Sequence, residues 1–484
     1  MRRLLTLVLL LMSLSVAAKT VNPLDYGLRT AKTGEERYYA LKRCHEDAVK
    51  HGYNISYKGI REIQISVPQD AVILPLPDVT DFAGVRIVMD NKTKNFRMFQ
   101  LQGTCELIEG VTGKIIDRGD YTSIEKLATG LKFVYLEDEN PWINTRLGYN
   151  STAVYKRKDI IVVKNGRAQN QPIMPYNNAN SQPKVWYSSV MGRKKVIKNL
   201  EFVRTAGSTF ISTPLALRFM YNVVISNITV TTPKESKLDR GDGCFIIEDC
   251  ARITMNDIKI DGTYSTPKLT GYGVRLLNVY DMRINRMNAH GGWGIFGNYN
   301  VNKAMLKDCD INRFDIHYYG CDIRSEDCIY RDLYNQFASV YGEVSFKNCE
   351  FINTIPVLME SSFNAYTPFE LVWQNCTFHL TKQKNYLITL FGVPQPYNDR
   401  PELRRKCLPN ITLKNCTVYL DDDVEKWQVV RTQGVAYKDS FDYMTDVNIN
   451  NVRVISKNEK PFEMYSEELK TTKPVKVKLK KFNH

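Results

Sequence analysis

The feature that most constrains this chain is an eight-residue phrase, apolar-x-apolar-x-(Asn/Asp)-(Cys or apolar)-x-apolar, that recurs along it. It reads VVISNITV at 223–230, VSFKNCEF at 344–351 and ITLKNCTV at 411–418. Alternating apolar residues predict strands with one buried face. A strand that returns with its polar residue at the same position indicates coils stacked in register, each strand bonded to its copy about 4.8 Å away. The phrase therefore predicts a parallel β-helix.

The fifth position of the phrase predicts a ladder of polar residues along the axis of the solenoid. Its members are Asn199, Asn227, Asp257, Arg286, Asp308, Asp327, Asn348, Asn375, Asn415 and Asn451. Asn adopts turn geometry readily and bonds neighbouring backbone, so we expect these side chains to stack and to point inward. Three of them also stand in Asn-x-Thr sequons, and an inward orientation argues against their glycosylation. Arg286 interrupts the pattern, and a different bend is expected there.

Five cysteines directly follow ladder residues: Cys309, Cys328, Cys349, Cys376 and Cys416. Cysteines in an oxidising compartment often form disulfides. However, the total of 11 is odd, and no Cys-x-x-Cys or His-rich zinc spacing occurs. Free Cys behaves as a small buried apolar residue. We therefore expect buried thiols in a stacked interior rather than a disulfide network or a metal site.

Residues 1–18 have the composition of a secretory signal peptide: a positive start, an apolar core and small residues before the cleavage point. The apolar run is shorter than the ~20 residues that a membrane span requires, and no later stretch qualifies. We expect cleavage near Ala18 and a periplasmic or secreted protein without a membrane span.

The mature chain, 19–484, is predicted to be one β-helix domain, with regular coils over about 195–460. Residues 24–52 are expected to cap its first coil, because the open end of a solenoid must be covered. Thr33 and Glu36 form a capping box that begins a helix there. Residues 100–195 lack the repeat and are expected to combine early coils with long excursions.

The formal net charge of +14 favours an anionic partner. An exported chain with no nucleic-acid motif is more compatible with an acidic polysaccharide than with nucleic acid. The alternative is a generically basic surface. We expect a monomer that binds an acidic glycan.

Coil length locates a candidate site. Between Arg286 and Asn348 successive ladder residues are 19–22 positions apart, whereas the spacing on either side is 27–40. Short coils between longer ones predict a compact floor between loop walls. On one strand of this floor, alternation places four chemically active side chains on a shared outward face. They are Arg313, Asp315, His317 and Tyr319.

A histidine beside a carboxylate can titrate near neutral pH. Asp315 is expected to orient His317, Arg313 to pair with Asp315 or face a ligand carboxylate, and Tyr319 to supply a phenol. The alternative is a structural row of ion pairs on a solvated strand.

Four further residues are candidates for binding substrate: Arg275, His290, Trp293 and Arg324. Arginine binds carboxylate or sulfate bidentately, and Trp293 could carry a sugar ring, although a packed corner explains it equally well. A basic loop over 400–406 could wall the cleft.

A competing site consists of the carboxylates Asp239, Asp242, Glu248 and Asp249. Two of these could form the acid–base pair of a glycosidase or bind Ca²⁺. No other cofactor and no metal site is expected.

Over roughly residues 24–460 the chain resembles the pectate-lyase-like superfamily, on its Leu-Asp-Tyr-Gly opening at 24–27 and its KNCEF, QNCTF and KNCTV coils. The resemblance implies an all-β, single-stranded right-handed parallel β-helix with an N-terminal capping helix, and polysaccharide lyase or glycoside hydrolase activity. Residues 312–317 resemble an Arg-Phe-Asp-x-His motif of secreted bacterial and phage β-helix proteins. The complete motif set of the polygalacturonase-like hydrolases does not occur, which favours a lyase.

The sequence thus predicts a polysaccharide lyase that cleaves a uronate-containing glycan, similar to a glycosaminoglycan or pectin, by β-elimination. His317 is the expected base, and Tyr319 or His290 the acid. Arg313, Arg275 or Arg324 would stabilise the enolate. The alternatives are a β-helix glycoside hydrolase that pairs Asp315 with a carboxylate from 239–249, and a non-catalytic glycan-binding protein.

Overall fold

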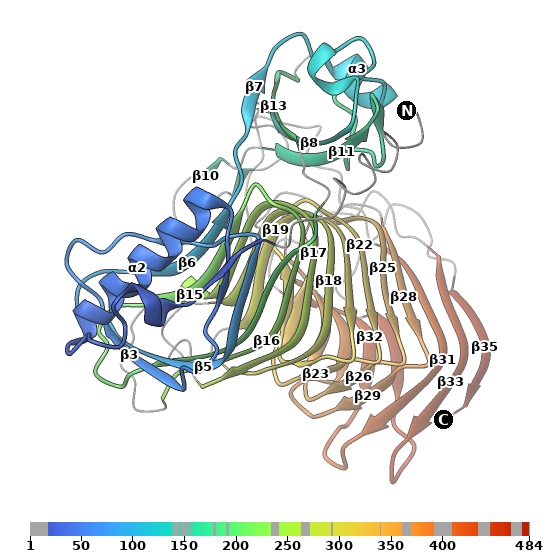
Figure 1. The fold of residues 1–484 in the computed structure, drawn as a ribbon. Helices are drawn as coiled ribbons and strands as arrows, with labels where there is room; N and C mark the ends of the chain where they lie inside the picture. Colours follow the sequence, from blue (N-terminus) through green and yellow to red (C-terminus); the bar gives the residue numbers. More distant parts are fainter. Residues whose placement is uncertain are drawn as a thin grey trace, which may run out of the picture.

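The computed structural model describes residues 18–138, 145–146, 153–154, 157–177, 181–189, 193–233, 242–262, 272–291, 294–338, 340–360, 369–391, 409–433, 446–465 and 477–483. Figure 1 shows a solenoid of stacked coils with helix α2 at one end and β35 at the other, and a smaller unit beside it.

Helix α2 (Gly34–His51) begins and ends as the sequence predicts. The Thr33 hydroxyl accepts a hydrogen bond from the Glu36 backbone N–H at 3.1 Å, and the Glu36 carboxylate accepts one from the Thr33 N–H at 3.3 Å. Gly52 ends the helix at φ 67°. A short 3-10 helix, η1 (Pro23–Tyr26), precedes it. The buried face of α2 joins the core of the first coils and covers their open end.

Most of the solenoid belongs to one parallel sheet of 23 strands. These strands are β1 (Thr20–Val21), β2 (Asn54–Ser56), β3 (Glu62–Ser66), β4 (Leu74–Pro75), β5 (Val79–Asp90), β6 (Phe96–Gln102), β14 (Lys195–Arg204), β15 (Ser212–Arg218), β16 (Tyr221–Thr231), β17 (Asp242–Asp261), β18 (Tyr272–Ala289), β19 (Gly294–Lys307), β20 (Asp310–Ile311), β21 (Phe314–Ile316), β22 (Gly320–Glu326), β23 (Ile329–Arg331), β25 (Val340–Lys347), β26 (Glu350–Ile352), β28 (Glu370–Gln374), β29 (Thr377–Leu380), β31 (Asn410–Leu420), β33 (Val447–Ile455) and β35 (Val477–Asn483).

A second parallel sheet completes the later coils. It contains β24 (Tyr334–Gln336), β27 (Ile355–Glu360), β30 (Tyr386–Phe391), β32 (Trp427–Gln433) and β34 (Phe462–Tyr465). In the earlier coils the same side of the solenoid is formed by β6, β15, β21 and the first parts of β17, β18 and β19, which pair in register with one another. The bridge from Ile316 to Phe337 joins these strands to the second sheet. We call this whole side of the solenoid the third face. It carries the candidate site.

All ten predicted ladder residues occupy the left-handed region, with φ between 52° and 64°. Asn and Asp tolerate this conformation better than most residues. The stacking is confirmed: Asn227 donates to Asn199 at 2.8 Å, and Asn451 to Asn415 at 2.9 Å. Two details of the prediction are wrong. The ladder side chains lie at the surface of the coil corner, and Arg286 bends like the others, with its guanidinium 2.6 Å from Asp257.

The cysteines that follow the ladder are buried free thiols, as predicted. Four of them donate to backbone carbonyls of neighbouring coils, as Cys376 Sγ does to Phe346 O at 3.3 Å. Burial raises the pKa of the Cys376 thiol, so it stays protonated. Within the described residues no group of three or more His, Cys, Asp or Glu could hold a metal ion.

The unit beside the solenoid lies between β6 and β14 and has an antiparallel sheet in the order β12-β11-β8-β13-β7. Its elements are β7 (Glu106–Ile108), α3 (Gly113–Arg118), η2 (Glu125–Leu127), β8 (Leu131–Asp138), β11 (Arg157–Lys164), β12 (Arg167–Ala168) and β13 (Pro183–Ser189), and a separate antiparallel pair, β9 (Thr145–Arg146) and β10 (Ala153–Val154). It has a core of its own. The early coils expected within 100–195 are therefore wrong: β14 pairs with β5 and β15 with β6, so the coil resumes only after this inserted unit.

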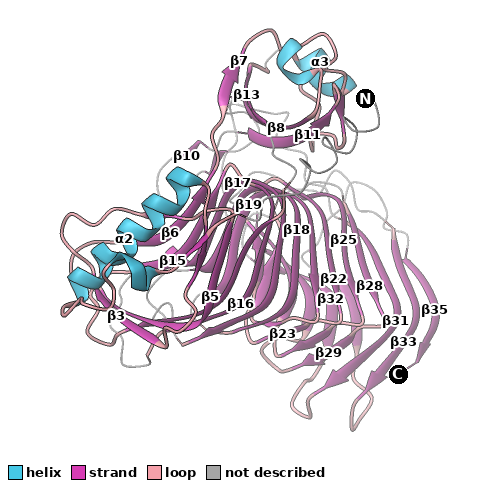
Figure 2. Ribbon diagram, in the orientation of Figure 1, coloured by secondary structure: helices cyan, strands magenta, loops and turns pink. Residues whose placement is uncertain are grey.

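Figure 2 shows how little helix accompanies the strands. Among the described residues, no helix is long and apolar enough to cross a membrane.

Candidate functional site

The third face brings Arg313, Asp315 and His317 together around β21. The Phe314 ring points inward and packs at a tilt against Phe296 of the preceding coil, with 5.1 Å between ring centroids. Asp315 pairs in register with Gly297 of β19, so it faces away from the core. The predicted alternation of inward and outward residues therefore holds at Phe314 and Asp315.

Arg313 and Asp315 form an ion pair, with 2.5 Å between Nη2 and Oδ2. Their side chains are only 2% and 0% exposed, so the expected open outward face is wrong for both. Gln336 of the next coil covers them: its backbone N–H donates to Asp315 Oδ1 at 3.0 Å, and its Oε1 accepts from Arg313 at 3.2 Å. Burial acts to lower the pKa of Arg313, but attraction to Asp315 and to nearby tyrosines outweighs it and raises the pKa.

His317 extends this pair towards solvent. Its Nε2 lies 2.9 Å from the Tyr272 hydroxyl and 3.5 Å from Asp315 Oδ2, and the side chain is 19% exposed. The Tyr272 hydroxyl is also 3.5 Å from Asp315 Oδ2. Carboxylate, imidazole and phenol thus form one connected group, in which the carboxylate is buried and the other two are partly exposed.

Sequence reasoning missed Tyr272, which opens β18 two coils before His317. Its ring packs where Gly297 has no side chain: a Cβ at that glycine would lie 2.3 Å from the ring. Gly297 is the signal that could have revealed this contact. Sequence reasoning also missed Tyr334, whose ring centroid lies 4.0 Å from the Arg313 guanidinium carbon. Both tyrosines come from other coils, and only the stacking of the coils brings them near β21.

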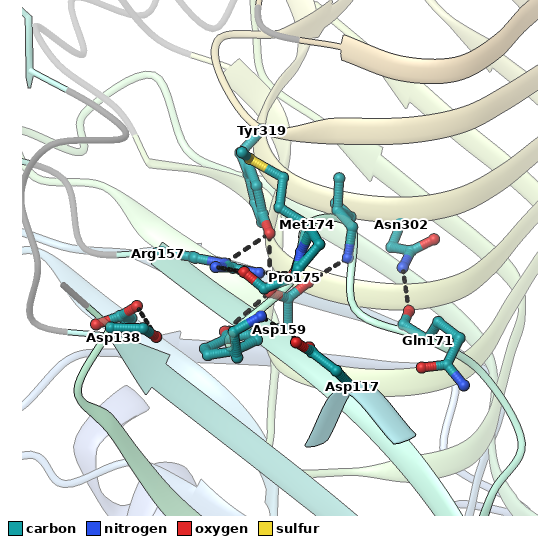
Figure 3. Close-up of polar contacts among 12 residues, drawn as sticks. Asp117, Asp138, Arg157, Asp159, Gln171, Met174, Pro175, Asn302 and Tyr319 are labelled. Atoms are coloured by element: carbon teal, nitrogen blue, oxygen red, sulfur yellow. Dashed lines mark hydrogen bonds and ion pairs between the residues drawn. The ribbon is translucent and has the colours of Figure 1, made fainter. Parts of the chain in front are cut away.

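Tyr319 does not belong to this group. It turns the corner after the third face at φ 58° and is fully buried. Its hydroxyl donates to Asp159 at 2.9 Å and accepts from Arg157 Nε at 2.8 Å, both in β11 of the inserted unit (Figure 3). Tyr176 also donates to Asp159, at 2.9 Å. We call Arg157, Asp159, Tyr176 and Tyr319 the junction cluster. Tyr319 is fully buried and bonded within the junction cluster, so it does not join the outward face predicted for it; burial raises the pKa of its phenol.

The predicted substrate-binding residues are scattered. Arg275 is half-buried on β18 of the third face, between the registered residues Val274 and Leu277. His290 lies on another face, 3.2 Å from Asp310. Arg324 lies in β22, 3.6 Å from Glu343. Trp293 lies outside the described residues, as does the basic loop at 400–406. We call Tyr272, Arg313, Asp315 and His317 the third-face cluster. Among the predicted substrate-binding residues that the structure describes, only Arg275 lies on the same face as this cluster.

The competing carboxylates do not join Asp315. Glu248 aligns with Leu277 and then Tyr299, which puts it three coil steps, roughly 14 Å, from the coil of Asp315. Glycosidase carboxylates lie about 5–9.5 Å apart. Burial raises the pKa of Asp249 to about 6, and Asn278 donates to it at 3.0 Å. Asp239 and the Asp242 side chain lie outside the description.

This geometry allows proton transfer. A phenol bonded to an imidazole can pass its proton to that imidazole, and a nearby carboxylate stabilises the imidazolium that forms. Arg313 and Gln336 hold the carboxylate in place.

Comparison of the fold identifies two phage tailspikes as similar structures. The Gp54 tailspike of Acinetobacter baumannii bacteriophage AP22, in complex with A. baumannii capsular saccharide, matches with a TM-score of 0.55 at 12% identity, over 90% of this chain and 69% of that one. The tailspike gp49 of Pseudomonas phage LKA1 matches with a TM-score of 0.54 at 13% identity, over 96% and 81%.

These likenesses establish the class of fold, a right-handed parallel β-helix as the resemblance implied. At such low identity they carry the fold and nothing further. No protein-family model matches the sequence, and no match occurs among curated proteins.

Proposed function

We propose that the protein is a polysaccharide lyase that cleaves a uronate-containing glycan by β-elimination on the third face. The single observation that carries this proposal is the contact of the Tyr272 hydroxyl with His317, 2.9 Å, next to a buried Asp315. The similar tailspike that was solved with a capsular saccharide shows a glycan on this type of scaffold, and the net charge of +14 favours an acidic one. The signal-like residues 1–18 support action outside the cytoplasm.

Access to solvent favours elimination over hydrolysis. A glycosidase needs two carboxyl groups that reach the scissile bond. Asp315 is 0% exposed and already bound by Arg313 and Gln336, so it cannot reach a sugar. The partly exposed groups of the cluster are an imidazole and a phenol, which suit removal of a proton from carbon.

In the proposed step, Tyr272 transfers its hydroxyl proton to His317 and removes the proton from C5 of the uronate. The C5–H and C4–O4 bonds break, a C4=C5 double bond forms, and the proton moves through the Tyr272–His317 pair to the leaving oxygen. Asp315 stabilises the imidazolium. Arg275 neutralises the uronate carboxylate, which lowers the cost of the developing enolate.

The test is digestion of a panel of acidic polysaccharides while both ultraviolet absorbance and new reducing ends are measured. Elimination gives one unsaturated end, and therefore ultraviolet absorbance, for each new reducing end. New reducing ends without absorbance would indicate hydrolysis and contradict the proposal. Binding without any cleavage of any polyanion would indicate a glycan-binding protein.

A further inference from the structure

A cavity of about 700 Å³ opens where the inserted unit leaves and rejoins the solenoid. Its lining comes from the end of α2, the corner after β15, and residues 101–104, 188–189 and 193–195 next to the inserted unit. The corner after β15, which lines this cavity, lies far from the third-face cluster. Positive-φ corners at Phe219, Asp249, Asn278, Asn300 and Tyr319 follow one another in successive coils, so four steps, roughly 19 Å, separate Phe219 from the coil of His317.

The lining has the mixed chemistry that a sugar requires. Tyr53 and Phe219 line it with half-buried aromatic rings, each with one neighbour over a face, His51 at 5.4 Å and Arg218 at 4.8 Å. Asn54, Ser188 and Ser189 supply amide and hydroxyl groups. Sugar rings have apolar C–H faces that pack on aromatic rings, and rims of hydroxyls that bond to such polar groups. A volume of this size is typical of sites for small organic ligands.

The charge of the lining favours an anion. Arg193, Lys194 and Lys195 lie on one side of the cavity. Asp78 is the acidic residue of the lining, and it lies 3.5 Å from Lys195. Arg193 and Lys194 are exposed and have no ion-pair partner among the described residues. Two cations beside aromatic rings and hydroxyls match a sugar that carries a carboxylate.

We infer that this cavity is a second binding site, separate from the third face, for a short acidic oligosaccharide. The aromatic rings would hold one sugar ring, and Arg193 and Lys194 its carboxylate. Such a site would hold a long acidic glycan against the solenoid at a distance from the reacting bond.

Hydrogen–deuterium exchange of the full chain can test this site by itself, with trigalacturonate, neutral maltotriose and inorganic sulfate as probes. The Tyr272→Phe background keeps the ligand from being consumed. Trigalacturonate is expected to slow exchange in 101–104 and 219–221, and maltotriose and sulfate are expected to have little effect there. Protection of 314–317 reports the third face separately, so failure of one site does not imply failure of the other.

The variant Arg193→Ala/Lys194→Ala is expected to raise the concentration for half-protection of 101–104 by about tenfold, and to leave protection of 314–317 unchanged. Lys114→Ala/Lys164→Ala removes two exposed charges of the inserted unit outside the cavity and should have no effect. Thr104→Trp, which fills the cavity from a loop, should abolish protection with the fold intact by circular dichroism. Absence of protection at 101–104, equal protection by sulfate, or insensitivity to Arg193→Ala/Lys194→Ala would overturn the inference.

Discussion

The third-face cluster and the junction cluster contain nearly the same residue types but have different surroundings. Each has a buried Arg–Asp pair with tyrosines around it: Arg313 and Asp315 at 2.5 Å, and Arg157 and Asp159 at 3.3 Å. The first pair continues to a partly exposed His317 and Tyr272. The second is sealed between the inserted unit and the solenoid. Access to solvent, rather than residue type, therefore separates a site that can perform chemistry from one that holds two units together.

The largest effect should come from Tyr272→Phe, which removes the proposed proton-transfer hydroxyl. We expect turnover to fall by about 10²–10⁴-fold, the usual contribution of general acid–base catalysis. Unsaturated product formed per unit time measures it. Tyr280→Phe is the matched control on the same strand, because Tyr280 packs among the residues beside the inserted unit and should leave turnover unchanged. Equal losses in both variants would remove Tyr272 from the mechanism.

A matched pair of substitutions tests the comparison itself. Arg313→Met and Arg157→Met each leave a buried carboxylate without its positively charged partner. Each should therefore lower the free energy of unfolding by about 3–5 kcal/mol, measurable by denaturant titration. At a temperature where both variants remain folded, only Arg313→Met should also reduce turnover strongly. If Arg157→Met reduced it as much, the junction cluster would belong to the catalytic machinery.

The free energy of unfolding should depend on pH because of Asp249, which lies at the coil corner beneath the inserted unit. Burial raises its pKa from 3.8 to about 6 in the folded protein. A raised carboxyl pKa contributes stability that is fully present below pH 3.8 and is lost as pH rises through 6. Asp249→Asn should therefore stabilise the protein by up to roughly 3 kcal/mol above pH 6 and by little at pH 4. A gain in unfolding free energy that did not depend on pH would argue against burial as the cause.

The smallest effect is expected for His290→Gln. His290 pairs with Asp310 at a partly exposed position on another face, and such pairs contribute about 0–1 kcal/mol. Turnover should not change, although the sequence offered this histidine as a general acid. A strong loss of turnover would place part of the site on that second face.

The sequence predicts the structure best where the repeat is local. The nine ladder corners at Asn or Asp, the buried thiols and the cap of α2 follow from residue type and spacing alone, whereas the corner at Arg286 follows from spacing against its residue type. The inserted unit could not be recognised in this way, because it has no repeat and its sheet is antiparallel. The inserted unit also buries residues of the solenoid corner that it covers, such as Tyr319, and their spacing does not indicate this burial.

The site was only partly predictable for a related reason. Alternation along one strand places Arg313, Asp315 and His317 together, but it cannot show what neighbouring coils lay over them. Tyr272 and Gln336 come from other coils: the Gln336 side chain accepts a hydrogen bond from Arg313, and the Tyr272 hydroxyl contacts His317. Tyr319 leaves the strand because the chain turns there at φ 58°, and Tyr is not a residue type that predicts such a turn.

A kinetic isotope effect tests the central claim most directly. A uronate oligosaccharide carrying deuterium at C5 should be cleaved more slowly than its unlabelled form, because elimination breaks the C5–H bond, and its products should carry unsaturated ends. Equal rates for the two substrates, together with saturated products, would contradict elimination at Tyr272 and His317.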